Sequence, residues 1–256
     1  MFVLRTIFAI AKALKYSICR KKEFMAYSEI YNIPEVMCDK DGNLSIRNLV
    51  SLMGEVLICH SHILEKNIDM TRLRWIVYSW DIELEEKIKA NDQIEVTSLV
   101  LGMNKFYAYR NAYIKRDGNM IAKAYGVFML VDIDRMRPIK MSKDLISAYK
   151  IDDKIYGKND LSYRNDFTNS KEIMVRYTDI DSNLHVNNAV YFDYICDLCK
   201  LDTKDLAFFN IVYKNEIRNK ESILGEFVES DGVIDFRLRS VEDNTIYTYG
   251  KIRKNV

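Results

Sequence analysis

The sequence has little of several residue types. Two prolines and nine glycines in 256 residues leave no room for a long flexible or polyproline linker. The five cysteines are an odd number scattered over a long chain, which argues against a secreted disulfide framework and for a reducing cytoplasm. Beyond residue 22, no uncharged run is long enough to span a bilayer. A Gly-rich phosphate loop and a G-x-S-x-G elbow are both missing, so nucleotide use and serine hydrolase chemistry are unsupported.

What is present is typical of a globular protein. Hydrophobic residues make up 48% of the chain and charged residues 29%, which excludes a disordered tail, a collagen-like fibre and a mucin-like stalk. Aromatic residues make up 12%, with 17 tyrosines, and this favours β-strands. At about 150 residues per domain, the length predicts one large domain or two small ones.

Basic and acidic groups nearly balance, at 38 against 37, but they are unevenly distributed. The first 22 residues hold no acidic group and six basic ones, which are Arg5, Lys12, Lys15, Arg20, Lys21 and Lys22. The rest of the chain therefore has 32 basic and 37 acidic groups, a net charge of −5. That sign is wrong for a general nucleic-acid binder, so no nucleic-acid partner is expected.

Residues 1–22 have the pattern of a basic amphipathic helix. Such a helix can lie on an anionic membrane surface. It is a poor secretory signal, because basic residues interrupt its apolar part and no small-residue cleavage site follows. We favour two other interpretations over membrane contact: a helix packed on the protein's own body, or an extension upstream of a working start at Met25. Residues 1–22 are therefore treated as an N-terminal extension.

Residues 23–150 predict one long helix followed by antiparallel strands. Ser45 is a good N-cap, and apolar residues recur at helical spacing from Leu49 to Leu64. Alternation with period two then predicts strands over residues 75–84, 93–101, 106–115 and 121–132. A curled antiparallel sheet around a single buried helix is an α+β arrangement.

The same plan returns in the second half. Residues 151–170 are polar and aperiodic, which predicts a linker. Within residues 171–256 the pattern predicts a helix over about 186–199 and strands near 173–177, 211–218, 223–229, 233–239 and 246–251. Residue identity between the halves is weak, so any duplication is ancient. The sequence thus predicts two domains of one kind.

A dense polar cluster lies between the first strand and the helix of the second half. Its members are Asp181, Asn183, His185, Asn187 and Asn188. Asp and Asn favour turns and helix caps, so a purely structural loop is one interpretation. Three features favour a functional site over a purely structural loop. His185 is the one histidine of the second half. The alternating spacing can turn three polar groups toward one pocket if the loop is extended, and N–H groups at the start of the next helix can stabilise an oxyanion.

The run DIDSNLHVNNAVYFDY (179–194) resembles the D-x-N-x-H-V-N-N-x-x-Y signature of the acyl-ACP thioesterases of plants and bacteria. The resemblance extends from about Met25 to the C-terminus, and in the first half it rests on residues 75–92, 105–110 and 131–138. It implies two tandem hotdog domains whose sheets join side by side. It also implies release of free fatty acid from acyl-acyl carrier protein, which ends fatty acid synthesis.

Four site residues follow from the resemblance. Asp181, Asn183 and His185 match the family's loop residues, and Glu216 matches an acidic residue on a later strand. Plant members carry a Cys after that acid, which has been read as a nucleophile. This chain has Ile217 there, which cannot attack a carbonyl and favours a mechanism without a covalent Cys intermediate.

Thioester hydrolysis needs an activated water and a polarised carbonyl oxygen. Glu216 or Asp181 can act as general base on water, and the sequence does not divide the role between them. His185 can hold that water or protonate the leaving thiolate, which needs little help because a thiol pKa is about 8.5. Asn183 can orient the substrate or His185.

The first half lacks a histidine at the equivalent loop; His60 and His62 lie later, on the helix, where we interpret them as packed or surface residues. We therefore expect the first domain to bind the acyl chain. Core packing explains each candidate lining residue equally well. The candidates are Met53, Leu57, Trp75, Phe106, Tyr107, Phe128 and Met129.

Partners and cofactors follow from the same interpretation. Acyl carrier protein is acidic, so a local basic patch is expected; the candidate clusters are Arg135, Arg137, Lys140 and Lys143, and Lys105, Arg110, Lys115 and Arg116. Cys196 and Cys199 lack a second ligand pair, so no metal or cofactor is expected.

Three alternatives stay open: an acyl-CoA thioesterase or a hydratase of the same fold, and a non-catalytic acyl-binding module. We expect a cytoplasmic enzyme with both domains in one chain, and the sequence leaves its homo-oligomeric state open.

Overall fold

The computed structural model describes residues 26–149, 164–218 and 221–255. The predicted N-terminal extension (residues 1–22), with its considered membrane contact, lies outside these ranges, as does most of the predicted linker (151–170). In the first half the elements are β1 (Ala26–Asn32), η1 (Glu35–Met37), α2 (Ile46–Leu64), β2 (Leu73–Leu84), β3 (Gln93–Asn104), β4 (Tyr107–Arg116), β5 (Asn119–Asp132), β6 (Arg137–Pro138) and α3 (Lys143–Ala148).

The second half repeats the plan on a smaller scale. Its elements are β7 (Asn169–Met174), η2 (Tyr177–Asp179), α4 (Val190–Cys199), η3 (Thr203–Asp205), β8 (Leu206–Tyr213), β9 (Ser222–Ser230), β10 (Val233–Arg239) and β11 (Ile246–Lys254). The predicted α+β class, with antiparallel strands curled around one helix in each half, is confirmed. No helix of the described residues is long and apolar enough to cross a membrane.

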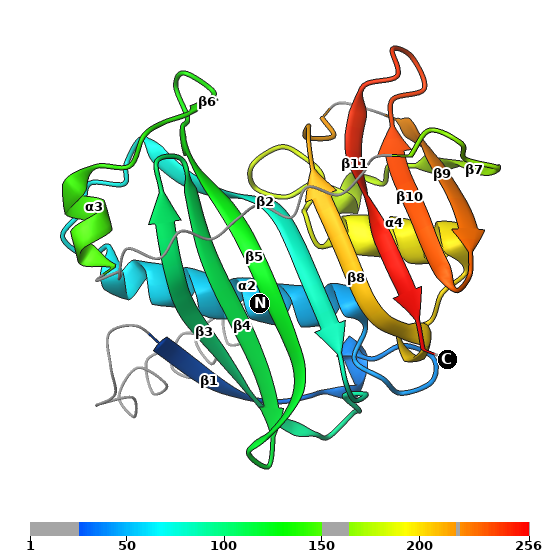
Figure 1. The fold of residues 1–256 in the computed structure, drawn as a ribbon, viewed down its shortest axis with the longest axis horizontal. Helices are drawn as coiled ribbons and strands as arrows, with labels where there is room; N and C mark the ends of the chain where they lie inside the picture. Colours follow the sequence, from blue (N-terminus) through cyan, green and yellow to red (C-terminus); the bar gives the residue numbers. More distant parts are fainter. Residues whose placement is uncertain (1–25, 150–163, 219–220, 256) are drawn as a thin grey trace, which may run out of the picture.

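All the described strands belong to one antiparallel sheet. Its order is β1-β3-β4-β5-β2-β8-β11-β10-β9-β7, with β6 beside β5. Figure 1 shows α2 and α4 on the same face of this sheet. Strand β2 joins the halves, because it pairs with β5 on one side and with β8 on the other, from Ser79 opposite Val212 to Glu83 opposite Phe208.

The long helix α2 forms where the sequence predicts it. The Ser45 side chain accepts a hydrogen bond from the Asn48 N–H at 3.2 Å and caps the helix. The apolar face of α2, which includes Met53, packs on the sheet and joins a core that continues into the second half through Phe192 and Phe209. Burial of such a shared core holds the two halves together.

Two predicted elements of the second half have different ends. Helix α4 starts at Val190 rather than near residue 186, because Val186 pairs with Ile180 and the Asn187 side chain accepts from the Ala189 N–H at 2.9 Å. Strand β8 covers Leu206–Tyr213 instead of 211–218. The chain leaves the sheet after Tyr213, so Glu216 lies in a loop and not on a strand.

Arg110 was predicted to be part of a basic surface cluster, and that prediction is wrong. Its side chain is 5% exposed and donates to Ser61 Oγ and Ser98 Oγ, both at 2.7 Å. His60 Nδ1 lies 2.9 Å from Arg110 Nη2. Burial lowers the pKa of Arg110 to about 10. Arg110 therefore belongs to an internal polar network, in which His60 is a packed histidine, and is unavailable to a partner protein.

Candidate active site

The loop that precedes α4 is anchored at its start by Asp179, which is 2% exposed. Its carboxylate accepts from the Arg176 N–H at 2.9 Å and from the Tyr194 hydroxyl at 2.5 Å. Burial raises the pKa of Asp179, but the hydrogen bonds from Arg176 and Tyr194 outweigh it, and the pKa lies below its usual value. Asp179 could not be predicted as the anchor of this loop, because its partners come together only in the folded structure.

The loop forms a tight turn and not the extended segment whose alternation would turn the three polar groups toward one pocket. Asp181 N–H donates to the His185 carbonyl at 2.9 Å, and Leu184 N–H donates to the Asp181 carbonyl at 3.0 Å. Leu184 has the left-handed φ of 62° that closes the turn. Asn183 folds back onto Asp181, with its N–H 2.8 Å from Oδ1. The three predicted polar residues are thus brought together by a turn, and Asn183 contacts Asp181 rather than His185.

His185 lies at the centre of the cluster and is 9% exposed. Its Nδ1 is 3.0 Å from the Val186 carbonyl oxygen, which can only accept a hydrogen bond, so Nδ1 carries the proton. The same Nδ1 is 3.8 Å from Asp181 Oδ1. The other nitrogen, Nε2, faces Glu216 Oε1 at 3.7 Å. A neutral His185 therefore presents an unprotonated nitrogen to a carboxylate.

Two backbone contacts place Glu216 beside His185. Val186 N–H donates to the Ile217 carbonyl at 3.0 Å, and Ile217 N–H donates to the Tyr191 hydroxyl at 3.2 Å. The Ile217 side chain is 0% exposed and belongs to the core. The Glu216 side chain, by contrast, is exposed, and its Oε1 lies 3.7 Å from His185 Nε2.

Most amides at the start of α4 are already used. The N–H groups of Asn187, Ala189 and Val190 donate to oxygens of the loop itself, at 2.9, 2.9 and 2.8 Å. In the part of the chain that the structure describes, the Asn188 N–H has no acceptor. Of residues 187–190, Asn188 therefore has the backbone amide that is free to bind another acceptor.

The predicted acyl-chain residues fall on two faces of the sheet. Phe128 and Trp75 pack toward the helix side, since both contact the smaller apolar cluster beside α2. Tyr107 and Met129 pair with each other on the opposite face, because strand neighbours alternate. The other three candidates are divided between the core and the surface: Met53 and Leu57 are 0% and 4% exposed on α2, and Phe106 is 39% exposed at the turn between β3 and β4.

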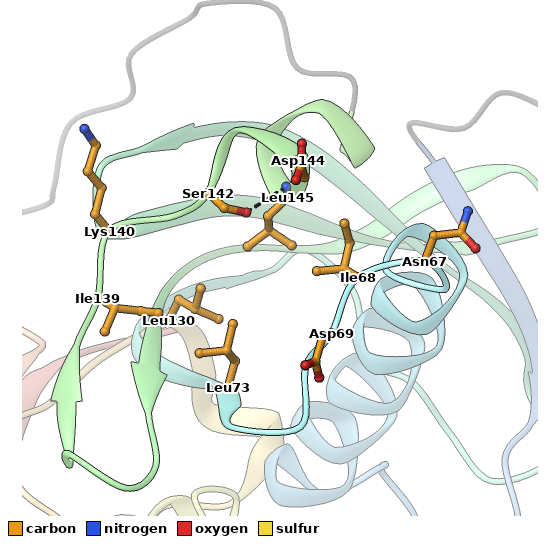
Figure 2. A pocket seen from close by; sticks show the side chains of 10 residues that line it. All are labelled: Asn67, Ile68, Asp69, Leu73, Leu130, Ile139, Lys140, Ser142, Asp144 and Leu145. Carbon is orange, nitrogen blue, oxygen red and sulfur yellow. Dashed lines mark hydrogen bonds between the residues drawn. The ribbon is translucent and has the colours of Figure 1, made fainter.

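A pocket of about 410 Å³ opens in the first half, away from this loop. It lies between the end of α2, the β5–β6 hairpin and α3 (Figure 2). None of the predicted acyl-chain residues lines it. Its walls are Asn67, Ile68, Asp69, Leu73, Leu130, Ile139, Lys140, Ser142, Asp144 and Leu145. Figure 2 shows the apolar members pointing inward and Lys140 pointing away from them.

Over the described ranges, no group of three or more His, Cys, Asp or Glu side chains is arranged to hold a metal ion. Cys196 and Cys199 are free cysteines that pack against the core. Burial raises the pKa of Cys199 to about 12, so its thiol stays protonated near neutral pH.

Two family models match the chain. The acyl-ACP thioesterase N-terminal domain matches residues 25–149, and the acyl-ACP thioesterase C-terminal domain matches residues 162–253. Together they cover well over half of the sequence. A search of curated protein sequences finds no match.

Several solved structures share the fold over nearly the whole chain. A structure described as an oleoyl thioesterase from Lactobacillus plantarum is 21% identical, covers 90% of this chain and 95% of its own, and has a TM-score of 0.77. An acyl-ACP thioesterase from Bacteroides thetaiotaomicron is 18% identical, with coverages of 90% and 98% and a TM-score of 0.76. The 12:0-ACP thioesterase from Umbellularia californica is 14% identical, with coverages of 93% and 99% and a TM-score of 0.79.

Proposed function

Because the chain belongs to the acyl-ACP thioesterase family and is a thioester hydrolase, we propose that Asp181, His185 and Glu216 hydrolyse its acyl-ACP substrate. The observation that carries the proposal is the 3.7 Å separation of His185 Nε2 and Glu216 Oε1. With the proton on Nδ1, His185 Nε2 and Glu216 Oε1 are both hydrogen-bond acceptors, so a group that lies between them must donate to both. A water molecule supplies two donors at once, so the pair is suited to hold the nucleophile.

Glu216 is the better candidate for the general base. It lies on the unprotonated side of His185, with Oε1 3.7 Å from Nε2, whereas the Asp181 carboxylate lies on the protonated side, 3.8 Å from Nδ1. As the water oxygen bonds to the thioester carbonyl carbon, its proton passes to Glu216 Oε1. General-base transfer of this kind typically contributes about 10²- to 10⁴-fold in rate.

Collapse of the tetrahedral intermediate then breaks the carbon–sulfur bond. The sulfur leaves with the bonding electrons as a thiolate and takes back the proton held by Glu216, so the site returns to its starting state. The Asn188 N–H is the proposed oxyanion donor during this step. Asp181, 3.8 Å from His185 Nδ1, stabilises any positive charge that develops on the imidazole. Asn183 holds Asp181 in place, a positioning role that differs from the predicted orientation of the substrate or of His185.

We propose that the two halves divide the work. Residues 171–256 hold the hydrolytic site, and residues 23–150 bind the acyl chain between α2 and the sheet. Of the seven lining candidates, Met53, Leu57, Trp75 and Phe128 lie on the helix side and fit this role.

Two further proposals concern the surroundings of the enzyme. For the carrier protein we propose the basic cluster of Arg135, Arg137, Lys140 and Lys143, all four of which are exposed. The cytoplasm remains the proposed location.

Parallel hydrolysis assays test the function directly. Acyl-ACP and acyl-CoA esters of the same chain are compared with the wild type and with His185→Ala. We expect faster turnover of the carrier-protein ester and a loss of about 10²-fold or more in the variant. Faster turnover of the CoA ester would contradict the substrate assignment, and an unaffected variant would contradict the site.

A further inference from the structure

The two oxygens of the Glu216 carboxylate have different neighbours. Oε1 faces His185 Nε2, while Oε2 accepts from Arg218 Nε at 2.6 Å and lies 2.6 Å from Arg218 Nη2. We propose that Arg218 is a positioning residue for hydrolysis: its guanidinium holds Oε2 so that Oε1 is presented to the water at His185. The inference rests on the proposed role of Glu216.

The local sequence explains why these two residues meet. Residues 216–218 lie beyond the end of β8, outside any helix or strand. Ile217 is directed into the core, so the side chains on either side of it point to the same outer face. Arg218 and Glu216 are therefore neighbours because of their spacing in the chain, and no pairing with another strand is needed to bring them together. The sequence pattern predicts residues 211–218 as a strand and gives no signal that Arg218 contacts Glu216.

Glu216 needs such a partner more than the other site residues do. His185 is buried, and the Asp181 side chain is 19% exposed and bonded within the turn. The side chain of Glu216 is 39% exposed, in a loop rather than a ladder. A glutamate in that setting loses rotamer freedom when it is fixed, and the planar two-donor guanidinium is well suited to fix a carboxylate in one orientation.

The exposure of Glu216 and Arg218 lets a substitution test positioning separately from stability. Arg218 is 39% exposed on its side chain, like Glu216, and ion pairs between solvent-exposed groups contribute little to the free energy of unfolding. Loss of the pair should therefore change the kinetics without unfolding the protein. A pair elsewhere offers a matched control: Lys254 Nζ lies 2.6 Å from Glu229 Oε1, with side-chain exposures of 32% and 41%.

Steady-state kinetics on acyl-ACP test the proposal. We expect Arg218→Ala to lower kcat by about ten- to a hundredfold, the scale of a small misplacement of a reacting group, and to leave KM within about twofold because ground-state binding is untouched. Arg218→Lys should recover part of kcat, since it keeps the charge but not the planar fork. Lys254→Ala should match the wild type.

A double variant separates positioning from carrier-protein binding. If Arg218 acts through Glu216, Arg218→Ala should have no further effect in the Glu216→Gln background. A rise in KM with unchanged kcat would overturn the proposal and assign Arg218 to the docking of acyl-ACP. Full kcat in Arg218→Ala would overturn it as well, whereas full kcat in Glu216→Gln would overturn the proposed function itself.

Discussion

The hydroxyl of Tyr191 accepts a hydrogen bond from the backbone N–H of Ile217 at 3.2 Å. Tyr191 stands in the first turn of α4, directly after the loop that carries His185, and Ile217 follows Glu216. Burial of Tyr191, which is 1% exposed, raises the pKa of its hydroxyl, so the group stays neutral. This one bond ties together the two segments whose side chains form the candidate active site.

Removal of that hydroxyl should weaken both fold and activity. Tyr191→Phe leaves the buried Ile217 N–H without an acceptor, and we expect a loss of about 1–3 kcal/mol in the free energy of unfolding, measured by urea denaturation. We also expect kcat on acyl-ACP to fall, because the loop that carries Glu216 is released. Tyr113→Phe, which removes a half-buried hydroxyl on β4, is the control. Equal stability and kcat in Tyr191→Phe and wild type would show that the bond does not hold the site.

The three polar residues of the site should contribute unequally. Glu216→Gln and His185→Ala should each lower kcat/KM by about 10²- to 10⁴-fold. Asp181→Asn should lower it less, since Asp181 contacts neither the proposed water nor the reacting carbonyl. Residues that act as a unit are not additive, so Glu216→Gln/His185→Ala should be scarcely worse than either single variant. Equal activity of all variants and the wild type would exclude this site.

A cysteine in place of Ile217 should not become a nucleophile. The side chain at this position is 0% exposed and directed into the core, so its sulfur would be held away from the thioester. We expect Ile217→Cys to form no covalent acyl-enzyme, as judged by mass spectrometry of the quenched reaction with acyl-ACP, and to keep its activity after treatment with iodoacetamide. An acyl adduct at residue 217 would contradict the inward orientation and the water-based mechanism.

Asp179 should give the fold a dependence on acidic pH. Its pKa is lower in the folded protein than in the unfolded chain, so its contribution to stability is present above the unfolded value of about 3.9 and is lost as the pH falls through the folded value. We expect Asp179→Asn to be less stable than wild type at pH 7, and the difference to shrink below pH 4. Urea unfolding at both pH values measures it, with the more exposed Asp193→Asn as control; a difference that grows on acidification would contradict the sign.

Substitution on the two faces of β5 tests where the acyl chain lies. Phe128 is on the helix side and stacks edge-on against Trp80, with ring centroids 5.4 Å apart. Phe128→Leu should open space there and shift the preference of hydrolysis toward longer acyl chains. Its neighbour Met129 points to the opposite face, so Met129→Leu should leave the chain-length profile unchanged. An altered profile in Met129→Leu alone would place the chain on the other side of the sheet.

The regular parts of this fold could be predicted from the sequence, because local rules determine them. Ser45 and the helical spacing up to Leu64 placed α2 within a residue of its observed ends, and β10 occupies the predicted residues 233–239. In both places capping or alternation agrees with the tertiary packing, so the pattern and the structure coincide.

The errors fall where long-range contacts override a local pattern. Residues 216–218 alternate as a strand does, but the backbone of Ile217 bonds to the Val186 N–H and the Tyr191 hydroxyl instead of a neighbouring strand, and β8 ends at Tyr213. The left-handed backbone of Leu184 could not be predicted, because leucine rarely adopts this conformation and so gives no sequence signal for it. The sequence alone predicts that Arg110 is a surface residue. Its burial depends on hydrogen bonds to Ser61 and Ser98, which lie on other elements.

The resemblance predicts Asp181, Asn183, His185 and Glu216 as candidate site residues. The division of labour that we propose among them could not be predicted from the sequence. The distinction between Asp181 and Glu216 depends on which nitrogen of His185 bears the proton, and the Val186 carbonyl at 3.0 Å decides it.

The pairing of β2 with β8 also determines how the protein unfolds and where it can aggregate. Among the strands that the structure describes, β1 and β7 form the two ends of the sheet, and backbone hydrogen bonds between β2 and β8 join the halves. Separation of the two halves would leave the backbone of β2 and of β8 unpaired along one edge each, and such edges promote aggregation. Unfolding of the first half would strip β8 of its partner in the same way. We therefore expect the two halves to melt in a single cooperative transition, and neither to be a well-behaved fragment by itself.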